Sequence, residues 1–356
     1  MSTIALLPGD GVGTEILDGP LAYLHHLQRD GLPITVTGPW PYGTTGWQQT
    51  GSILPPETVQ ACRDADVILS GAVGTHPGVT PAECPNPEAA LIELRHLFDL
   101  RVSVRTVWFP DGHDVIVVRN ITEGAYAGPD RRQESDGVRP AEDLIVLQPA
   151  RVEEVIAIGA DHAQRHPDRP VISVDKASVF ATSRLWRRSA AKVLPMRGVA
   201  YRDVNVDRAA YELVKDPELP GVVITEGIFG DILSDILCAR AGSPALCGSA
   251  TINPDRPFGS GATALFEPAH GSSPHRTGSR RSNPTGAWLA LADLLDWCPD
   301  LARFGLATQV RAALDAAIAT GPATYDLAEA GAAVADLDEF NERVLDRLGE
   351  QVRARR

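Results

Sequence analysis

Two aspartates one helical turn apart have the clearest potential for chemistry in this sequence. Asp231 and Asp235 lie in the segment Phe-Gly-Asp-Ile-Leu-Ser-Asp, and their i, i+4 spacing places both carboxylates on one face of a helix. The apolar residues 221–225 are predicted to form a buried strand just before them. Carboxylates at the carboxyl end of such a strand favour a site for a hard divalent cation. A solvated acidic helix face is the alternative.

Three arginines are candidates for binding a carboxylate substrate. Arg95, Arg105 and Arg119 lie near or between the ends of predicted elements, and a planar guanidinium matches a carboxylate through two hydrogen bonds. Three such side chains aimed at one point would bind a dicarboxylate or a tricarboxylate. Separate surface arginines are the alternative, because the sequence alone does not show convergence.

Three further side chains are candidates for proton transfer or metal binding. Lys176 follows a predicted buried strand and is a candidate for proton transfer, or else for pairing with an acidic neighbour. Tyr126 lies in a glycine-containing turn, where its hydroxyl can donate a proton or its ring can cover the core. Asp207 precedes a helical stretch and is either a third metal ligand or the N-cap of that helix.

Three loops have the composition of cofactor-binding segments. Residues 266–274 combine a carboxylate, an imidazole, a glycine and two hydroxyls, and residues 282–286 begin a helix whose free N–H groups can meet a phosphate. The glycines at positions 9, 11 and 13 form G-x-G-x-G rather than G-x-G-x-x-G, and no acidic residue ends a second strand about 20 residues later. That loop fits a phosphate cradle or an ordinary strand-to-helix turn, and a Rossmann fold is not predicted.

These residues must be positioned by alternating strands and helices. Continuous apolar runs alternate with helical stretches, a pattern typical of a parallel sheet covered on both faces. The runs lie at residues 3–7, 65–70, 114–118, 170–174 and 221–225. Residues 241–263 are rich in Gly, Pro and Ser and are expected to be loop-rich. We therefore predict an α/β fold with a large, mostly parallel sheet.

Composition narrows the classes of function. The 356 residues favour one large domain or two closely packed ones, and 44% hydrophobic with 22% charged residues is typical of a globular protein. A net charge of −13 without a long basic tract argues against nucleic-acid binding. The five cysteines form no CxxC pair, which indicates a reducing compartment without disulfides or a zinc site. No leader-like start or membrane-spanning run is evident, so we expect a cytoplasmic protein with no membrane partner.

Taken in order, the motifs form a specific series. It runs from Leu-Leu-Pro-Gly-Asp-Gly-Val-Gly through Glu-Leu-Arg95, Val-Val-Arg119, Gly-Ala-Tyr126, Val-Asp-Lys176, Val-Asp207 and Phe-Gly-Asp231 to Glu-Pro-Ala-His-Gly-Ser and Ser-Asn-Pro. This series resembles the metal-dependent β-decarboxylating hydroxyacid dehydrogenases. That family includes 3-isopropylmalate, isocitrate, homoisocitrate and tartrate dehydrogenases. The resemblance covers nearly the whole chain, from residue 4 to at least residue 327.

The resemblance implies an isopropylmalate-dehydrogenase-like two-domain fold that is not a Rossmann fold. Residues 1–100 plus 240–356 would form the cofactor-binding domain, and residues 101–239 the dimerisation and substrate domain. The substrate would be a 2-hydroxy acid with a second carboxylate at C3, held by the three arginines. Mg²⁺ or Mn²⁺ would be coordinated by Asp231 and Asp207, with Asp235 as ligand or close support. In the implied homodimer, Lys176 and Asp207 would reach the site of the other subunit.

The resemblance also implies a reaction. Lys176 would assist deprotonation of the C2 hydroxyl while C2 gives a hydride to a nicotinamide cofactor. The resulting β-keto acid would lose CO₂ with help from the metal, and Tyr126 would protonate C3.

The helix before Arg95 would read the variable group of the substrate. Leu91 and Ile92 resemble the apolar pocket of isopropylmalate dehydrogenases, and Glu88 matches their acidic position. Ala89 and Leu91 replace the polar residues with which isocitrate enzymes meet a third carboxylate. An apolar substituent is therefore expected, because an unpaired carboxylate there would be costly, and 3-isopropylmalate is the default substrate.

The nucleotide would contact residues from several loops. The resemblance assigns this role to Val12, Glu267, His270, Gly271, Ser272, His275, Arg276, Asn283 and Tyr325. NAD-using members usually have Asp where this chain has His275, and the basic pair formed with Arg276 suits a 2′-phosphate. Tyr325 also resembles NADP-using members, although Glu329 replaces their arginine. NADP is slightly favoured over NAD.

Three positions depart from the family pattern. Asn120 follows Arg119 where the family usually has Glu, and Ser178 and Gly227 each replace a usual Asn. A specialised paralogue acting on tartrate, homoisocitrate, isocitrate or a malate analogue of secondary metabolism is therefore an alternative. A non-catalytic regulatory paralogue is another, disfavoured by the retained lysine, tyrosine and aspartates. A metal phosphohydrolase is disfavoured because no histidine accompanies the aspartates.

Overall fold

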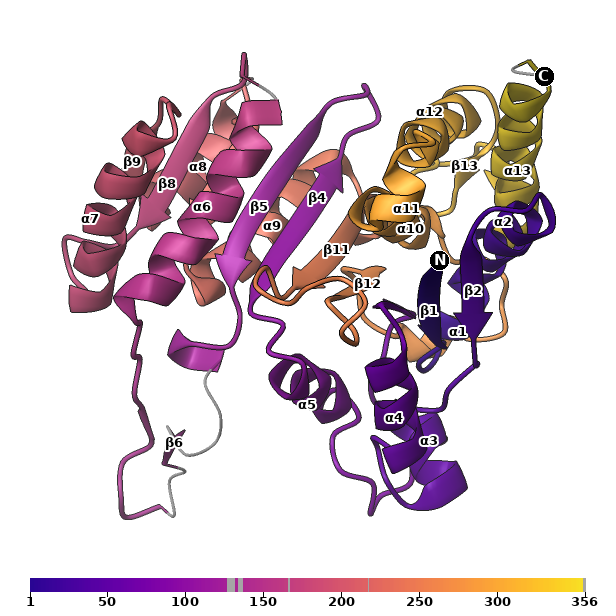
Figure 1. The fold of residues 1–356 in the computed structure, drawn as a ribbon, viewed down its shortest axis with the longest axis horizontal. Helices are drawn as coiled ribbons and strands as arrows, with labels where there is room; N and C mark the ends of the chain where they lie inside the picture. The colour runs from indigo at the N-terminus through magenta and orange to yellow at the C-terminus, as the bar shows by residue number, and fades with distance from the viewer. Residues whose placement is uncertain (127–131, 134–136, 166, 217, 355–356) are drawn as a thin grey trace. The chain divides into compact units, whose positions relative to one another are not determined.

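The chain forms two compact units (Figure 1). The computed structural model describes residues 1–126, 132–133, 137–165, 167–216 and 218–354. Unit 1 comprises Met1–Phe98, Phe109–Gly112 and Gly242–Arg356, and unit 2 comprises Asp99–Trp108 and His113–Ala241. The assignment of cofactor binding to the first unit and dimerisation to the second stays a prediction.

Unit 1 is built around five strands in the order β2-β1-β3-β12-β11. All neighbouring pairs are parallel except β11 with β12. The strands are β1 (Ser2–Leu7), β2 (Ile34–Thr37), β3 (Val67–Ser70), β11 (Cys247–Ile252) and β12 (Ala264–Pro268), with the short pair β13 (Ala323–Thr324) and β14 (Val334–Ala335) apart from them. The central strands are buried along their length, as expected for a sheet covered on both faces.

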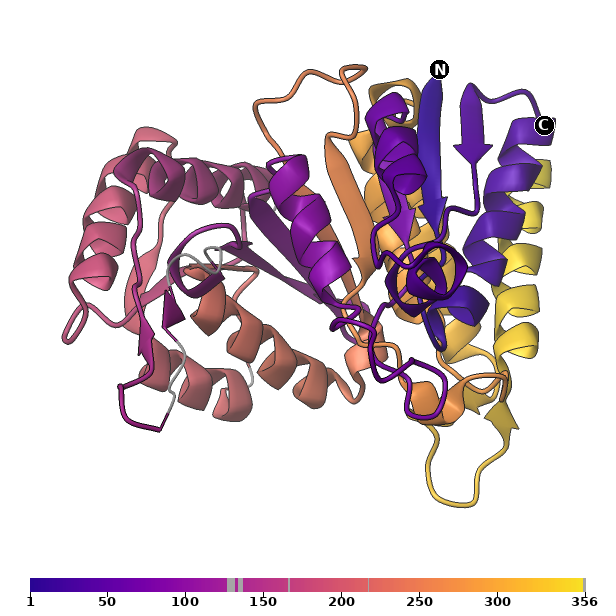
Figure 2. The same cartoon turned by 90° about the horizontal axis from the view of Figure 1, so that it is seen from below.

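Helices cover the sheet of unit 1 (Figure 2). They are α1 (Gly13–Ile16), α2 (Asp18–Arg29), α3 (Gly43–Thr50), α4 (Pro56–Asp64), α5 (Ala89–Leu97), α10 (Thr285–Trp297), α11 (Pro299–Ala302), α12 (Leu306–Ala319) and α13 (Leu337–Ala354), with the short 3₁₀ helices η3 (Pro244–Leu246) and η4 (Pro274–Arg276). Helix α10 packs against β3, β11 and β12 and is itself covered by α12. Its apolar residues are buried on all sides, which is why its sequence is hydrophobic all round.

Unit 2 has the strand order β4-β5-β10-β8-β9. Within this order β4 and β5 pair antiparallel, as a hairpin, and the other neighbouring strands pair parallel. The strands are β4 (Val102–Trp108), β5 (Asp114–Asn120), β8 (Val171–Asp175), β9 (Arg202–Asn205) and β10 (Val222–Thr225). A separate short pair, β6 (Arg132–Gln133) and β7 (Glu142–Asp143), lies between β5 and β8 along the chain. The helices are η1 (Gly124–Tyr126), α6 (Pro149–Arg165), α7 (Ala181–Met196), α8 (Val206–Lys215) and α9 (Gly227–Ala241).

Alternation along β10 explains how unit 2 is layered. A Cβ added at Gly159 of α6 would lie 2.5 Å from Ile224, whereas a Cβ at Gly230 of α9 would lie 3.0 Å from Thr225. Successive strand residues point to opposite faces, so α6 and α9 cover opposite faces of this sheet. Helix α7 packs on α6, and α8 packs on α9. The α/β fold with a mostly parallel sheet is therefore confirmed.

One expectation from the sequence is incomplete and one alternative is wrong. Residues 241–263 are loop-rich, as expected, but they also contain β11, which is fully buried. Its Gly, Ser and Cys side chains are small because α10 packs closely on it: a Cβ at Gly248 would lie 2.9 Å from Leu289. Asp207 is not a helix N-cap; Asn205 occupies that position, and Asp207 lies in the first turn of α8.

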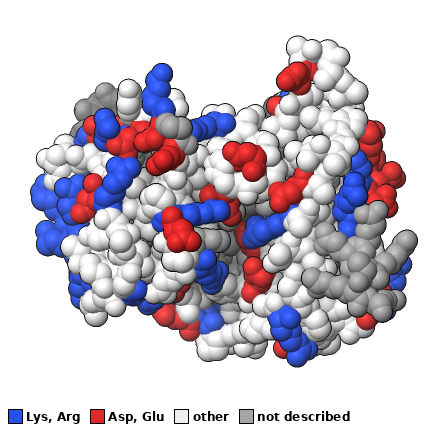
Figure 3. Space-filling view, turned by 90° about the horizontal axis from the view of Figure 1, so that it is seen from above, with Lys and Arg blue, Asp and Glu red and all other residues white. Residues whose placement is uncertain are grey.

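Three predictions from composition can be compared with the structure: surface charge, membrane-spanning helices and disulfides. On the face drawn in Figure 3, Lys and Arg are interspersed with Asp and Glu rather than gathered into a basic stripe. None of the described helices is long and apolar enough to cross a bilayer. None of the five cysteines, all within the described residues, forms a disulfide.

Candidate active site

Unit 2 brings four of the predicted residues into one cluster. Arg105 lies within β4, Arg119 near the carboxyl end of β5, Tyr126 at the end of η1, and Asp231 in the second turn of α9. Helix α9 packs on both β4 and β5 and contacts η1. Residues far apart in the sequence therefore meet because one helix crosses the hairpin and the turn that follows it.

Arg119 is at the centre of this cluster. Its Nη2 lies 2.8 Å from Oδ1 of Asp231, and its Nη1 donates to the Gly227 carbonyl oxygen at 2.9 Å and to the Tyr126 hydroxyl at 3.4 Å. The residue is only 3% exposed, and desolvation lowers the pKa of its guanidinium, with nearby Arg105 adding to the effect. A buried cation of this kind requires an anionic partner, and Asp231 is that partner here.

Tyr126 is placed by its ring and by its hydroxyl. The hydroxyl donates to Oδ2 of Asp231 at 3.1 Å, and the guanidinium carbon of Arg119 lies 5.5 Å from the ring centroid, within range of a cation–π contact. Tyr126 is half-buried. Its hydroxyl therefore faces the arginine–aspartate pair rather than the core, as the proton-donor hypothesis requires.

Arg105 connects the two aspartates of α9. Its Nη1 lies 3.1 Å from Oδ1 of Asp231 and 3.8 Å from Oδ1 of Asp235, and it donates to Oγ of Ser234 at 2.7 Å. Ser234 is fully buried and donates in turn to the Asp231 carbonyl oxygen at 2.9 Å. The serine thus fixes the arginine against the helix, and the predicted i, i+4 pairing of the aspartates on one face is confirmed by their shared contact.

The donor atoms of this cluster suit a hard cation. Asp231 and Asp235 offer carboxylate oxygens, and their side chains are 40% and 78% exposed, so solvent and ions reach both. Within the described residues, no three acidic, histidine or cysteine side chains of one chain come together in a metal-binding group. One chain therefore supplies two of the three predicted carboxylates at this place.

The third predicted carboxylate, Asp207, is paired with Lys176. Lys176 follows β8 directly, and its Nζ donates to Oδ1 of Asp207 at 2.5 Å. That hydrogen bond lowers the pKa of the Asp207 carboxyl. Asp175, the last residue of β8, forms two hydrogen bonds with Arg187 at 2.8 Å and accepts from the Ala177 N–H. The loop carrying Lys176 is therefore anchored to α7.

Unit 1 carries the third predicted arginine. Arg95, in the last turn of α5, donates to Oε1 of Glu267 at 2.8 Å. Glu267 is buried, so this ion pair is shielded from solvent. The predicted pocket residues Glu88 and Leu91 lie in the turns before it, and Glu88 is exposed whereas Leu91 is half-buried. A Cβ at Gly74 would lie 3.4 Å from Oε1 of Glu88.

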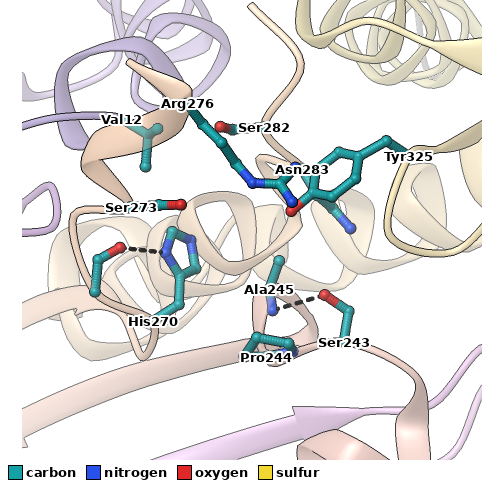
Figure 4. A pocket seen from close by; sticks show the side chains of 11 residues that line it. Val12, Ser243, Pro244, Ala245, His270, Ser273, Arg276, Ser282, Asn283 and Tyr325 are labelled. Atoms are coloured by element: carbon teal, nitrogen blue, oxygen red, sulfur yellow. Dashed lines mark hydrogen bonds between the residues drawn. The ribbon is translucent and has the colours of Figure 1, made fainter. Parts of the chain in front are cut away.

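Unit 1 also contains a cavity of about 320 Å³ formed by several loops (Figure 4). Six of the nine predicted nucleotide-binding residues line it, namely Val12, His270, Gly271, Arg276, Asn283 and Tyr325. Glu267, Ser272 and His275 do not. Ser273 and Ser282 also line it and lie in the two predicted cofactor-binding segments, residues 266–274 and 282–286. The sequence did not indicate Ser243, Pro244 and Ala245, because a short 3₁₀ turn of small residues carries no periodic signal.

Arg276 and Tyr325 form one wall of this cavity. The guanidinium carbon of Arg276 lies 3.5 Å from the centroid of the Tyr325 ring, and its Nε lies 3.1 Å from Nε2 of His275. Figure 4 shows the guanidinium extended across the tyrosine ring. Stacking holds this cation in place at the cavity edge while leaving its edge groups available to an anion.

His270 presents a hydrogen-bond acceptor. Desolvation lowers the pKa of its imidazole, which is therefore neutral at pH 7. Its Nδ1 lies 3.0 Å from the Gly271 carbonyl oxygen; because a carbonyl only accepts, Nδ1 carries the proton. The buried Nε2 has no partner among the described residues, so it is an acceptor that can receive a donor from a ligand.

Asn283 has a positioning role that the sequence did not indicate. Its Oδ1 accepts from Thr285 N and Oγ1 at 3.0 and 2.6 Å, and its Nδ2 donates to Oδ2 of Asp326 at 3.1 Å. The carboxylate of Asp326 also accepts from the Ser243 hydroxyl. These bonds fix the start of α10 and join three loops of the cavity.

The glycines of the first loop serve a close approach of backbones. A Cβ at Gly11 would lie 2.2 Å from the Ser272 carbonyl oxygen, and one at Gly13 would lie 2.4 Å from that of Ala72. The Val12 N–H donates to the same Ser272 oxygen at 2.9 Å. The loop is therefore bound directly to residues 270–273, which explains its glycines by packing.

Comparison with known proteins identifies the family to which the chain is similar. Residues 3–344 match the profile of the family described as isocitrate/isopropylmalate dehydrogenase. A 3-isopropylmalate dehydrogenase of Desulfitobacterium hafniense is 34% identical, with 98% of this chain and 100% of that protein covered. One from Salinibacter ruber is also 34% identical, covering 98% of this chain and 96% of the relative.

The chain belongs to the isocitrate/isopropylmalate dehydrogenase family. Solved structures of this family agree with that assignment. An isocitrate dehydrogenase from Methylococcus capsulatus matches with a TM-score of 0.84 at 26% identity, over 98% of this chain and 99% of that chain. A β-decarboxylating dehydrogenase from Thermococcus kodakarensis matches with a TM-score of 0.79 at 28% identity, over 99% and 97%. The family resemblance of the motifs is confirmed, and the protein is a member of a family of decarboxylating dehydrogenases.

Proposed function

We propose that this protein catalyses the NAD(P)-dependent oxidative decarboxylation of a 3-substituted malate, with 3-isopropylmalate as the default substrate. The observation that carries the proposal is the cluster in which Arg105, Arg119 and Tyr126 all contact Asp231. It combines carboxylate binding, a proton donor and a metal-binding carboxylate at one place. Similarity to proteins named 3-isopropylmalate dehydrogenase, at 34% identity, supports the same reaction.

Asp231 and Asp235 would hold Mg²⁺ or Mn²⁺, with Asp207 as the third carboxylate. The bound ion lowers the pKa of a hydroxyl and stabilises negative charge developing on a carbonyl oxygen. Carboxylate oxygens are the ligands such ions prefer, and both α9 carboxylates are accessible.

The arginines would bind and orient the substrate carboxylates. Asp231 forms ion pairs with both Arg105 and Arg119. A substrate carboxylate can take over the same guanidinium groups bidentately, which frees Asp231 for other ligands. The resemblance assigns Arg95 the same task toward a second carboxylate, with Glu267 fixing its orientation.

Two side chains would move protons. Lys176 takes the proton of the C2 hydroxyl as a hydride leaves C2, and Tyr126 returns a proton to C3 after CO₂ is lost. The contacts of the Tyr126 hydroxyl with Asp231 and Arg119 support this role, because they hold the phenolic group beside the carboxylate proposed to bind the metal.

The cavity of unit 1 would bind the nucleotide, with NADP slightly favoured over NAD. Arg276 stacked on Tyr325 presents a fixed cation suited to a 2′-phosphate. The acceptor Nε2 of His270 suits a hydroxyl or amino donor of the nucleotide.

The substituent on the malate would be apolar. Leu91 replaces a residue that would meet a third carboxylate, and the neighbouring Ile92 is 47% exposed on the same helix. Binding of an apolar group over these side chains is favourable because it removes their apolar surface from water.

A homodimer would complete the site. Four large apolar side chains of α8 and α9 are exposed: Tyr211 and Val214 at 59%, Ile228 at 37% and Ile232 at 56%. A second copy of this chain packing on this surface would bury them. Asp207, in the first turn of α8, and Lys176, which pairs with it, would then act in the site of the other subunit.

A panel assay tests the proposal. Purified protein with Mg²⁺ or Mn²⁺ is assayed for NADH and NADPH formation with 3-isopropylmalate, other 3-alkylmalates, isocitrate, homoisocitrate and tartrate. We expect 3-alkylmalates to be turned over fastest. Faster turnover of isocitrate would refute the role assigned to Leu91, and no turnover of any substrate would refute the enzyme proposal.

A further inference from the structure

Gly227 begins α9 at a position where the family usually has Asn. Its backbone lies in the ordinary helical range rather than at positive φ, so a side chain is not excluded by backbone conformation. The space beside its Cα is nevertheless filled. A Cβ there would lie 2.8 and 3.1 Å from Cδ2 and Cε2 of the Tyr126 ring, and 2.7 Å from the Asn120 carbonyl oxygen. The ring of Tyr126 thus occupies the volume that a side chain at position 227 would need.

The backbone groups around this contact are held in place. Asn120 is 3% exposed and ends β5, so its carbonyl belongs to the sheet. The Gly227 carbonyl accepts from Arg119 at 2.9 Å, which ties the start of α9 to β5. Displacement would therefore fall on the Tyr126 ring, whose hydroxyl lies 3.1 Å from Asp231 and 3.4 Å from Arg119.

We infer that Gly227 is a positioning residue for Tyr126: the missing side chain lets the tyrosine ring lie against the first turn of α9, with its hydroxyl at the arginine–aspartate pair. The catalytic consequence of this inference rests on the proposed function, whereas the placement of the tyrosine ring does not.

The test combines a spectroscopic and a kinetic measurement on the full-length protein. The six tyrosines are labelled with 3-fluorotyrosine, and the Tyr126 resonance is assigned with Tyr126→Phe. We expect Gly227→Ala and Gly227→Asn to shift that resonance. Gly349→Ala is the matched control, because this helical glycine has nothing within 4 Å of an added Cβ, and it should leave the resonance unchanged. An unshifted Tyr126 resonance in both Gly227 variants would overturn the inference.

Kinetics test the consequence for catalysis. With the best substrate of the panel, Gly227→Ala should lower kcat by about 10- to 100-fold, since small misplacements of a reacting group have effects of this size, and change KM by less than about threefold. In the Tyr126→Phe background the same substitution should change kcat by less than about twofold. An equal loss in both backgrounds would contradict the inference.

Two further outcomes remain decisive. If Gly227→Ala lowers the melting temperature, Tyr126→Ala should restore part of the loss, because removing the ring vacates the space; no restoration would count against the inference. If the wild-type protein turns over no malate, the proposed function fails, while the fluorine resonance still decides whether position 227 places Tyr126.

Discussion

The hydroxyl of Tyr126 lies 3.1 Å from Oδ2 of Asp231. This single contact joins the residue proposed to return a proton to the residue proposed to bind the metal. It exists because α9 begins with a glycine on which the tyrosine ring rests, and because Arg119 holds both partners from the adjacent strand.

Replacing Tyr126 by Phe removes the hydroxyl but keeps the ring. We expect kcat for oxidative decarboxylation to fall by about 10²- to 10⁴-fold, the usual contribution of a general acid. The melting temperature should change little because packing against Gly227 is retained. Steady-state kinetics and thermal unfolding check both parts. A variant with wild-type kcat would show that another group protonates C3.

Replacing Asp231 by Asn should abolish metal-dependent turnover. The substitution removes a charged ligand, and it removes the carboxylate that pairs with Arg119. Mn²⁺ binding, measured by electron paramagnetic resonance, should weaken by at least about 10-fold. The matched control is Asp161→Asn, an exposed aspartate paired with Arg197 in the same unit, which should keep Mn²⁺ affinity. Unchanged affinity in Asp231→Asn would exclude this carboxylate as a ligand.

Replacing Arg276 by Ala should raise KM for NADP by about 10- to 100-fold, the effect of losing a charge-assisted hydrogen bond. KM for NAD should change by less than about threefold, because NAD lacks the 2′-phosphate. Arg303, stacked on Phe304 at 4.9 Å and absent from the cavity lining, provides the control substitution. Equal effects on both nucleotides would show that Arg276 does not read the 2′-phosphate.

Glu226 should make stability depend on pH. Burial raises the pKa of its carboxyl to about 7, from an ordinary value of 4.5. The folded protein therefore keeps a proton that the unfolded chain releases, so this stabilisation is fully present below the unfolded pKa and is lost as pH rises to about 7. Relative to Glu226→Gln, the wild type should lose on the order of 2 kcal/mol across that window. Chemical unfolding between about pH 5 and 8 measures this difference.

The exposed Glu57→Gln substitution is the control for this comparison and should show no such change. A constant free-energy difference between wild type and Glu226→Gln over the whole range would mean that the folded carboxyl ionises normally.

Mixed dimers test whether the site is shared. Lys176→Ala and Asp231→Asn should each be inactive alone. If Lys176 acts in the site of the other subunit, a heterodimer of the two variants contains one intact site, so random re-assembly restores about a quarter of wild-type activity. If Lys176 acts within its own chain, every site in the mixture remains defective and no activity returns. Refolding the two variants together and separately distinguishes these results.

Much of the site was predictable because its residues follow strands. Arg119, Lys176 and Asp231 each come at or shortly after the end of an apolar run, and such runs in parallel sheets place their carboxyl ends at one edge. The sheet itself follows from the same runs. Strand β11 was missed because its small side chains, which α10 requires, have the composition of a loop.

Other features depend on distances between segments that sequence spacing does not encode. The hydrogen bonds of Asn283 with Thr285 and Asp326 and the cavity residues Ser243 and Ala245 arise where separate loops meet. The space above Gly227 is filled by a ring about a hundred residues earlier in the chain. Side-chain packing between distant segments determines these contacts. The sequence pattern identifies residues that take part but not which of them meet.

The most direct test is the stoichiometry of the reaction. Purified protein with Mn²⁺, NADP and 3-isopropylmalate is followed for nucleotide reduction and for CO₂ release from substrate labelled in the C3 carboxylate. The account predicts one CO₂ for each nucleotide reduced, and neither product from Asp231→Asn. Nucleotide reduction without CO₂, or no reduction with any malate and either nucleotide, would contradict it.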